Sequence, residues 1–229
     1  MFYGVDPYYL KIVLPAVIFA IYAQMRVSSV YAKYRVVQNA RGKTGAEVAR
    51  EILDMNGLQN VAIERIPGNL NDHYDPRTQV VRLSDSVYAN RSIAAIGIAA
   101  HETGHAVQHS TKYLPLMFRN SFVPVASFGS GLGPWLAIVG LFFGMPMLVN
   151  AGIVLFTAAV AFTLITLPVE LNASGRAIRT LEGTGILAAE EITPAKKVLN
   201  AAALTYVAAA AVAVANLLRL IMAANRRRD

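Results

Sequence analysis

Long apolar runs alternate with polar stretches along the chain, and this alternation is the strongest structural signal in the sequence. The first apolar run, YYLKIVLPAVIFAIYAQM, extends from Tyr8 to Met25. Between Asn120 and Val169 there is no Asp, Glu, Lys or Arg, which leaves room for two spans of about 20 residues each. A fourth run covers Ala201–Ala224. The pattern predicts a mainly α-helical integral membrane protein with about four transmembrane helices.

The polar stretch after the first run predicts a small α+β region. The sequence TGAE at Thr44–Glu47 is a capping box that begins a helix over Gly45–Asn56. Three runs with strand character follow, VAIERI, NDHY and QVVRLS, separated by the turn sequences PGN and DPRT. We expect them to form a short antiparallel sheet. An apolar helix then runs from the N-cap Ser92 through at least Val107.

The second half of the chain predicts a membrane hairpin. The sequence GMP at Gly144–Pro146 is expected to turn the chain between its two spans. Glycines four residues apart, Gly129 with Gly133 and Gly140 with Gly144, favour close helix packing.

Further helices follow the hairpin. A helical pattern after Pro168 ends near Gly183, and the last helix is expected to begin with Thr193 as N-cap and Pro194 at its first position. The sequence thus divides into a first span (1–25), a polar region with the sheet and the histidine helix (26–119), the hairpin (120–169), a helix with its connector (170–199), and a fourth span with a basic tail (200–229).

The stretch AAHETGHAVQHS carries the candidate chemistry. His101 and His105 are one helical turn apart, so both imidazoles can reach one metal ion at about 2 Å. Glu102 is rotated away from direct ligation, into the position of a general base. His109 lies about 12 Å along the helix from His101, so we expect it at the rim or behind the ligands. The chain has no cysteine, so the metal ligands must be histidines and carboxylates.

A catalytic zinc site needs a third protein ligand. After Glu102 no acidic residue occurs until Glu170, at the end of the third span, so the hairpin can return this carboxylate to the side of the histidines. An ordinary interfacial carboxylate paired with Arg176 or Arg179 is the other interpretation of Glu170. The rival ligands lie upstream and are His73, Asp72, Asp75 and Asp85.

Charge predicts the orientation in the membrane. The net charge is +7, and twelve Lys or Arg lie between the first two spans, four between the last two and none in the hairpin turn. Positive segments favour the cytoplasmic side, so we expect a multi-pass cell-membrane protein with its site facing the cytoplasm, and no nucleic-acid partner. With four spans the RRR sequence at Arg226–Arg228 would lie outside, so either this tail is a tolerated exception to the rule or the last helix lies in the interface instead of crossing. The sixteen inner charges outweigh the tail and favour four spans.

Several segments resemble the YugP-like membrane zinc metallopeptidases, over most of the chain: DHYDPRTQVVRLSDSVY, AAHETGHAVQ, LPVELNASGRA and AKKVLNAAALTYVAAA. More distantly, the arrangement is similar to gluzincins of the HtpX and CAAX prenyl protease type. The resemblance implies one catalytic Zn²⁺ ion bound by His101, His105 and Glu170, with Glu102 as the catalytic glutamate. Those distant relatives carry Asp four residues after the ligand glutamate, where this chain has Ser174.

The residues alone predict a zinc hydrolase, and the resemblance adds the peptide bond as its substrate. The alternatives are a zinc hydrolase acting on a non-peptide amide and a non-catalytic membrane assembly factor with a structural metal. Candidates for orienting the ligands or stabilising the oxyanion are His73, Tyr74, Tyr88, His109, Asn172, Ser174 and Arg176.

The expected partners follow from this function. A peptide or membrane-protein substrate would add as a strand along NDHY, because strand addition recognises backbone and tolerates many sequences. The lipid bilayer is the other partner, and the formation of a homo-oligomer stays open.

Overall fold

The computed structural model describes residues 8–226. Most of the basic tail, Arg227 and Arg228, lies outside the described residues. The chain forms two compact units. We call residues 8–24, 117–168 and 205–226 the span unit, and residues 25–116 and 169–204 the polar unit.

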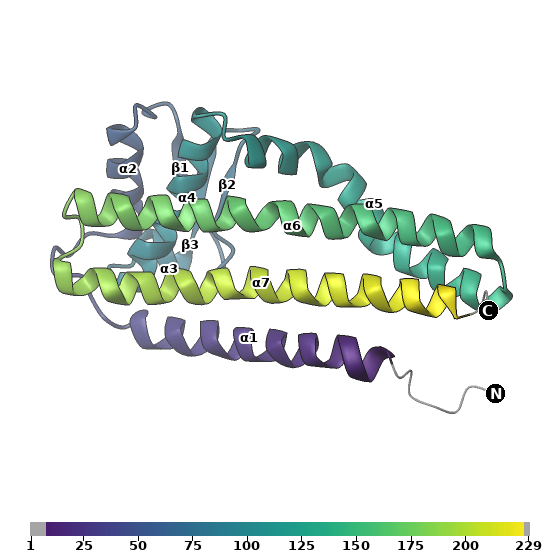
Figure 1. The fold of residues 1–229 in the computed structure, drawn as a ribbon. Helices are drawn as coiled ribbons and strands as arrows, with labels where there is room; N and C mark the ends of the chain where they lie inside the picture. The colour runs from purple at the N-terminus through teal and green to yellow at the C-terminus, as the bar shows by residue number, and fades with distance from the viewer. Residues whose placement is uncertain (1–7, 227–229) are drawn as a thin grey trace. The chain divides into compact units, whose positions relative to one another are not determined.

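Four long helices carry the apolar runs, as predicted. Within the described residues, these four are long and apolar enough to cross a membrane. Their bounds are Leu14–Tyr34 for α1, continuing the π-helical η1 over Tyr9–Val13, then Leu114–Phe143 for α5, Pro146–Gly183 for α6 and Ala189–Asn225 for α7 (Figure 1). Large apolar side chains of the span unit, such as Ile18, Trp135 and Val154, are exposed, as expected for surfaces that face lipid.

The hairpin of α5 and α6 depends on glycines for its close packing. A Cβ added at Gly129 would lie 2.3 Å from the carbonyl oxygen of Leu155, and one added at Gly133 would lie 2.8 Å from the amide nitrogen of Phe156. The predicted packing role of this pair is confirmed. Gly144 instead has open space around it and a φ of +68°, so it serves the turn.

The polar unit begins with the predicted capped helices. The helix α2 covers Gly45–Met55, and its capping box is present, with Thr44 and Glu47 each bonding the other's backbone N–H. The helix α4 covers Ile93–Ser110, and the Ser92 hydroxyl accepts from the N–H of Ala95. A short helix α3, Asp85–Tyr88, precedes it.

The sheet is mixed, and the prediction of an antiparallel sheet was wrong. Its strands are β1 (Ala62–Ile66), β2 (His73–Asp75) and β3 (Val80–Ser84), in the order β1-β3-β2. The two turns reverse the chain twice, so β1 and β3 point the same way and pair in parallel, whereas β2 pairs antiparallel to β3. The strand β3 takes the centre because four of its five residues are buried.

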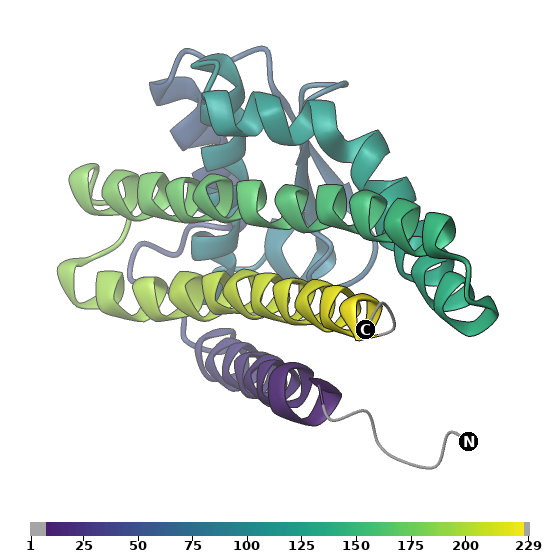
Figure 2. The same ribbon diagram turned by 45° about the vertical axis from the view of Figure 1, so that its right-hand side comes forward.

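Two helix boundaries also differ from the prediction. The helix α6 continues through Pro168, so one helix contains both the end of the third apolar run and Glu170. The helix α7 begins at Ala189, before Thr193, because Glu191 accepts from the N–H groups of Ala188 and Ala40 and fixes an earlier start. The short connection between the two helices is visible in Figure 2.

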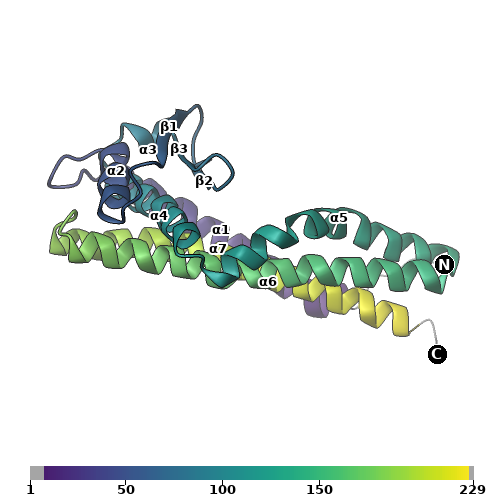
Figure 3. The same cartoon turned by 90° about the horizontal axis from the view of Figure 1, so that it is seen from above.

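The helix α4 contributes residues to two apolar cores of the polar unit. One face of α4 packs with β3 and α2, and another packs with α2, the end of α6 and the start of α7. In Figure 3 the sheet and α2 lie on one side of α4 and the end of α6 on the other. A helix held on both sides is a rigid support for chemical groups.

Candidate metal centre

Two helices of the polar unit bring three metal-ligating side chains together. His101 and His105 project from α4, and Glu170 projects from α6. The Oε2 atom of Glu170 lies 3.3 Å from Nε2 of His101 and 3.5 Å from Nε2 of His105. The three ligand atoms lie within 4.8 Å of one another. Sequence positions 65 residues apart, at His105 and Glu170, thus form one cluster.

The spacing of these atoms fits zinc. Zinc bonds of about 2.0–2.1 Å in tetrahedral geometry separate ligand atoms by about 3.3 Å. The two nitrogen-to-oxygen distances of 3.3 and 3.5 Å agree with that separation. The donor set of two imidazoles and one carboxylate is also that of a catalytic zinc site with an open fourth position.

Small residues allow α4 and α6 to approach closely enough for this geometry. A Cβ added at Gly104 would lie 2.9 Å from the carbonyl oxygen of Ala173, so only glycine fits there without a shift. On α6, Glu170, Ala173 and Ser174 share one face, since they are three and four residues apart. The close approach of the two helices, at Gly104 and Ala173, therefore lies beside the metal-ligating residues of both helices.

The second nitrogen of each histidine has a partner. Nδ1 of His101 lies 3.0 Å from the hydroxyl of Ser174, and Nδ1 of His105 lies 3.0 Å from Oε1 of Gln108. Such contacts fix the orientation of metal-binding imidazoles. Burial by itself lowers the pKa of His105, but contact with Glu170 and the charge of Glu102 raise this pKa overall. The two carboxylates therefore favour a positive charge at His105.

Glu102 lies beside the ligands and is held by the sheet. The residue is 8% exposed, and its Oε2 accepts from the backbone N–H of Tyr74 in β2 at 3.1 Å. The hydroxyl of the same tyrosine lies 2.9 Å from Nδ1 of His109. The strand β2 is therefore tied to α4 at two points, one at Glu102 and one at the end of the helix.

The upstream rivals for the third ligand are engaged elsewhere. Asp72 accepts from the N–H and hydroxyl of Ser84, Asp75 pairs with Arg82, and Asp85 pairs with Arg65. His73 is exposed, and its Nδ1 contacts the carbonyl of Asn71. In the described chain, the metal-ligand cluster contains Glu170 and none of these four.

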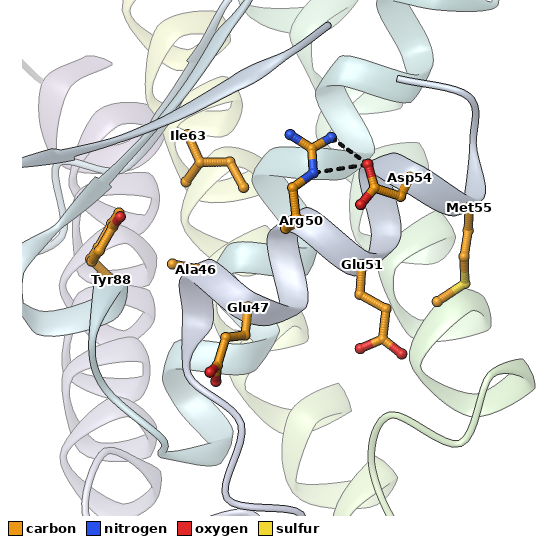
Figure 4. Close-up of a pocket in the computed structure, with 8 residues that line it drawn as sticks. All are labelled: Ala46, Glu47, Arg50, Glu51, Asp54, Met55, Ile63 and Tyr88. Atoms are coloured by element: carbon orange, nitrogen blue, oxygen red, sulfur yellow. Dashed lines mark hydrogen bonds and ion pairs between the residues drawn. The ribbon is translucent and has the colours of Figure 1, made fainter. Parts of the chain in front are cut away.

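The remaining candidates differ in whether hydrogen bonds connect them to the metal ligands. Asn172 accepts from Nε of Arg176 and from Nε2 of Gln108. Because Gln108 contacts the metal ligand His105, the predicted residues Asn172 and Arg176 are connected to the metal ligands through Gln108. Tyr88 packs against the apolar core formed by α2, β3 and α4, and it lines a pocket of about 730 Å³ beside α2, with Ala46 and Ile63 (Figure 4). The described structure gives Tyr88 and His73 no hydrogen bond to the metal ligands.

Gln108 was missed as a site residue. The metal-ligand motifs at and after His105 do not include Gln108 as a ligand. Its position three residues after His105 places it on the same face of α4, and that spacing was the available signal. Its importance depends on partners from α6, which the sequence does not specify.

Comparison with known proteins agrees with this site. A family model described as "Putative neutral zinc metallopeptidase" matches residues 9–225. A Bacillus subtilis (strain 168) protein described as "Putative membrane protease YugP" is 50% identical over 208 residues, which cover 91% of this chain and 92% of that protein. No solved structure matches the chain. The chain therefore belongs to this family of zinc metallopeptidases, and the family implies zinc for the cluster of His101, His105 and Glu170.

Proposed function

We propose that this protein is a membrane-embedded zinc-dependent endopeptidase that hydrolyses peptide bonds with Glu102 as general base and general acid. The observation that carries the proposal is the meeting of three zinc-type ligand atoms within 4.8 Å, with Glu102 directly after the first ligand in the chain. Family membership and the similarity to a membrane protease support the same conclusion.

The proposed roles follow from chemistry. A zinc ion held by His101, His105 and Glu170 would supply a Lewis acid for the reaction. Glu102 accepts the proton of the attacking water and later delivers it to the leaving amine. The hydrogen bond from the Tyr74 N–H keeps one oxygen of Glu102 in place and leaves the other for the proton.

The outer edge of β2, which no other strand of the described sheet covers, is the proposed substrate-binding edge. Tyr74 lies opposite Val81 in the sheet, yet its N–H donates to Glu102, so this N–H points away from β3. A peptide that adds along β2 would therefore run past the general base. Strand addition selects backbone over side chains, which suits an enzyme that cleaves more than one sequence.

Orientation is part of the proposal. The sixteen Lys and Arg residues of the two polar segments support a site on the cytoplasmic side of the cell membrane, by the positive-inside rule. The substrates would then be cytoplasmic or membrane-exposed segments of proteins.

The decisive experiment compares the wild type with Glu102→Gln, using Glu182→Gln, an exposed position of α6, as a control. Each protein is purified in detergent, analysed for zinc and assayed with casein and with a membrane protein. We expect stoichiometric zinc in all three, and a loss of about 10²–10⁴-fold in hydrolysis for Glu102→Gln alone.

Other outcomes would separate the alternatives. If the wild type and Glu102→Gln both hold zinc and cleave alike, the proposed general base is wrong. Zinc-dependent hydrolysis of simple amides without cleavage of peptides would indicate a non-peptide amidase. Stoichiometric zinc without any hydrolysis would indicate a structural metal.

A further inference from the structure

Gln108 is fully buried between the two helices that carry the ligands. It lies on α4 three residues after His105 and has no exposed surface. Its Oε1 is 3.0 Å from Nδ1 of His105, and its Nε2 is 2.8 Å from the carbonyl oxygen of Val169 and 3.0 Å from Oδ1 of Asn172. Every polar atom of this side chain is therefore engaged.

These partners determine which way the amide points. A backbone carbonyl only accepts, so the Gln108 atom beside Val169 has to be the amide nitrogen. The amide oxygen then faces His105, and because this oxygen can only accept, Nδ1 of His105 has to carry the proton. The lone pair of the other His105 nitrogen is left facing Glu170, where a metal ligand needs it.

Asn172 and Arg176 extend this orientation to the next turns of α6. A guanidinium only donates, so the Asn172 atom at 2.8 Å from Nε of Arg176 has to be the oxygen. That oxygen accepts from Arg176 and from Gln108 together. The guanidinium also lies 6.0 Å from the centre of the Tyr113 ring, which holds it in place.

We infer that Gln108 is a positioning residue that fixes the metal-binding tautomer of His105, and that Asn172 and Arg176 fix the direction of its amide. The inference rests on the proposed metal site, but it does not require that the protein cleaves peptides. It assigns neutral partners to both histidines, an amide for His105 and a hydroxyl for His101.

The test measures zinc affinity in the full-length protein in detergent, by competition with a chelator. Gln108→Leu should bind zinc about 10–100-fold more weakly, as is usual when a hydrogen bond to a metal-binding histidine is lost. The control is Thr103→Val, because Thr103 is also fully buried on α4, and its hydroxyl donates to the Ala100 carbonyl oxygen of the same helix. The control should stay within about twofold of the wild type.

A second pair of variants guards against loss of folding. Asn172→Asp keeps the accepting oxygen and should bind zinc like the wild type, whereas Asn172→Leu removes it and should weaken binding by about tenfold. The absorption spectrum of bound Co²⁺ should change in Gln108→Leu and Asn172→Leu only. Thermal unfolding of the metal-free proteins measures the separate effect on stability.

The outcomes distinguish this inference from the proposed function. If the wild type binds zinc tightly and Gln108→Leu binds it equally tightly, the positioning role is wrong while the peptidase stands. Equal affinities for Asn172→Asp and Asn172→Leu would remove Asn172 from the role. A wild type that binds zinc without hydrolysing anything would overturn the peptidase and leave the positioning test valid.

Discussion

His101 and His105 are equivalent in the motif but differ in their surroundings. Nδ1 of His101 meets the hydroxyl of Ser174, whereas Nδ1 of His105 meets a buried amide. A hydroxyl can rotate to donate or accept, but the Gln108 oxygen can only accept. The structure therefore fixes the tautomer of His105 more strictly than that of His101.

The carboxylate ligand can be tested directly. Glu170→Ala removes one of three ligands and should lower zinc affinity by at least about 100-fold, whereas Asp75→Ala should leave it unchanged, because Asp75 pairs with Arg82. The measurement is zinc stoichiometry after dialysis against a chelator. The opposite pattern would transfer the ligand role to Asp75.

Asp75 should contribute to stability in a pH-dependent way. Its hydrogen bonds from Arg82, from Thr78 and from the N–H of Arg77 hold its pKa well below the usual range. A lowered pKa in the folded state gives stability that is present above the ordinary value of about 4 and is lost as the pH falls below it. Between about pH 4 and pH 2, the thermal stability of Asp75→Asn should therefore fall less than that of the wild type.

A reciprocal variant controls this measurement. Arg82→Met removes the main partner of Asp75, so the thermal stability of this variant should also fall less than that of the wild type over the same pH range. Equal acid sensitivity of the wild type and Asp75→Asn would show that this ion pair does not contribute.

At the scale of elements, the contact of α4 with α6 sets the geometry of the site. Gly104→Ala places a methyl group 2.9 Å from the carbonyl of Ala173, so the helices must separate. We expect a loss of about 1–3 kcal/mol in the free energy of unfolding. Zinc affinity should fall by about tenfold, because Glu170 moves away from the histidines.

Gly97 provides a matched control on the same helix. A Cβ added there would lie 3.9 Å from the side chain of Leu199, which is ordinary contact. Gly97→Ala should raise the free energy of unfolding by up to about 1 kcal/mol, through helix propensity, and leave zinc affinity unchanged. Chemical denaturation and chelator competition measure the two quantities. If both variants bind zinc equally well, the close approach is not needed for the site.

The elements themselves were largely predictable, and their pairing was not. The capping box at Thr44 and the N-cap at Ser92 are local signals, and both helices begin there. The strands were also found, but their order depends on burial of β3 against α2 and α4. Local sequence does not contain that contact, so the predicted antiparallel sheet gave the wrong direction of pairing for β1.

At the scale of the whole molecule, the orientation in the membrane is the main prediction. The sequence contains no cysteine, so an introduced one is the only thiol that a label can reach. We expect Met145→Cys, in the turn between α5 and α6, to react with a membrane-impermeant maleimide on intact cells. Gln59→Cys, after α2, should react only after permeabilisation.

The same method decides how α7 lies. If α7 crosses the membrane, Asn225→Cys should react from outside, like Met145→Cys, despite the neighbouring arginines. Reaction only after permeabilisation would place the end of α7 on the inner side. Labelling of Gln59→Cys in intact cells would overturn the proposed orientation.

The sequence by itself determined the four apolar helices, the capped helices and the histidine pair with its glutamate, because each depends on periodicity or composition within about 20 residues. It also narrowed the third ligand to Glu170 and four rivals. Only the tertiary structure grouped Glu170 with the two histidines, paired β1 with β3 and brought Gln108 to Val169. These facts depend on contacts between segments far apart in the chain, and such contacts are set by packing.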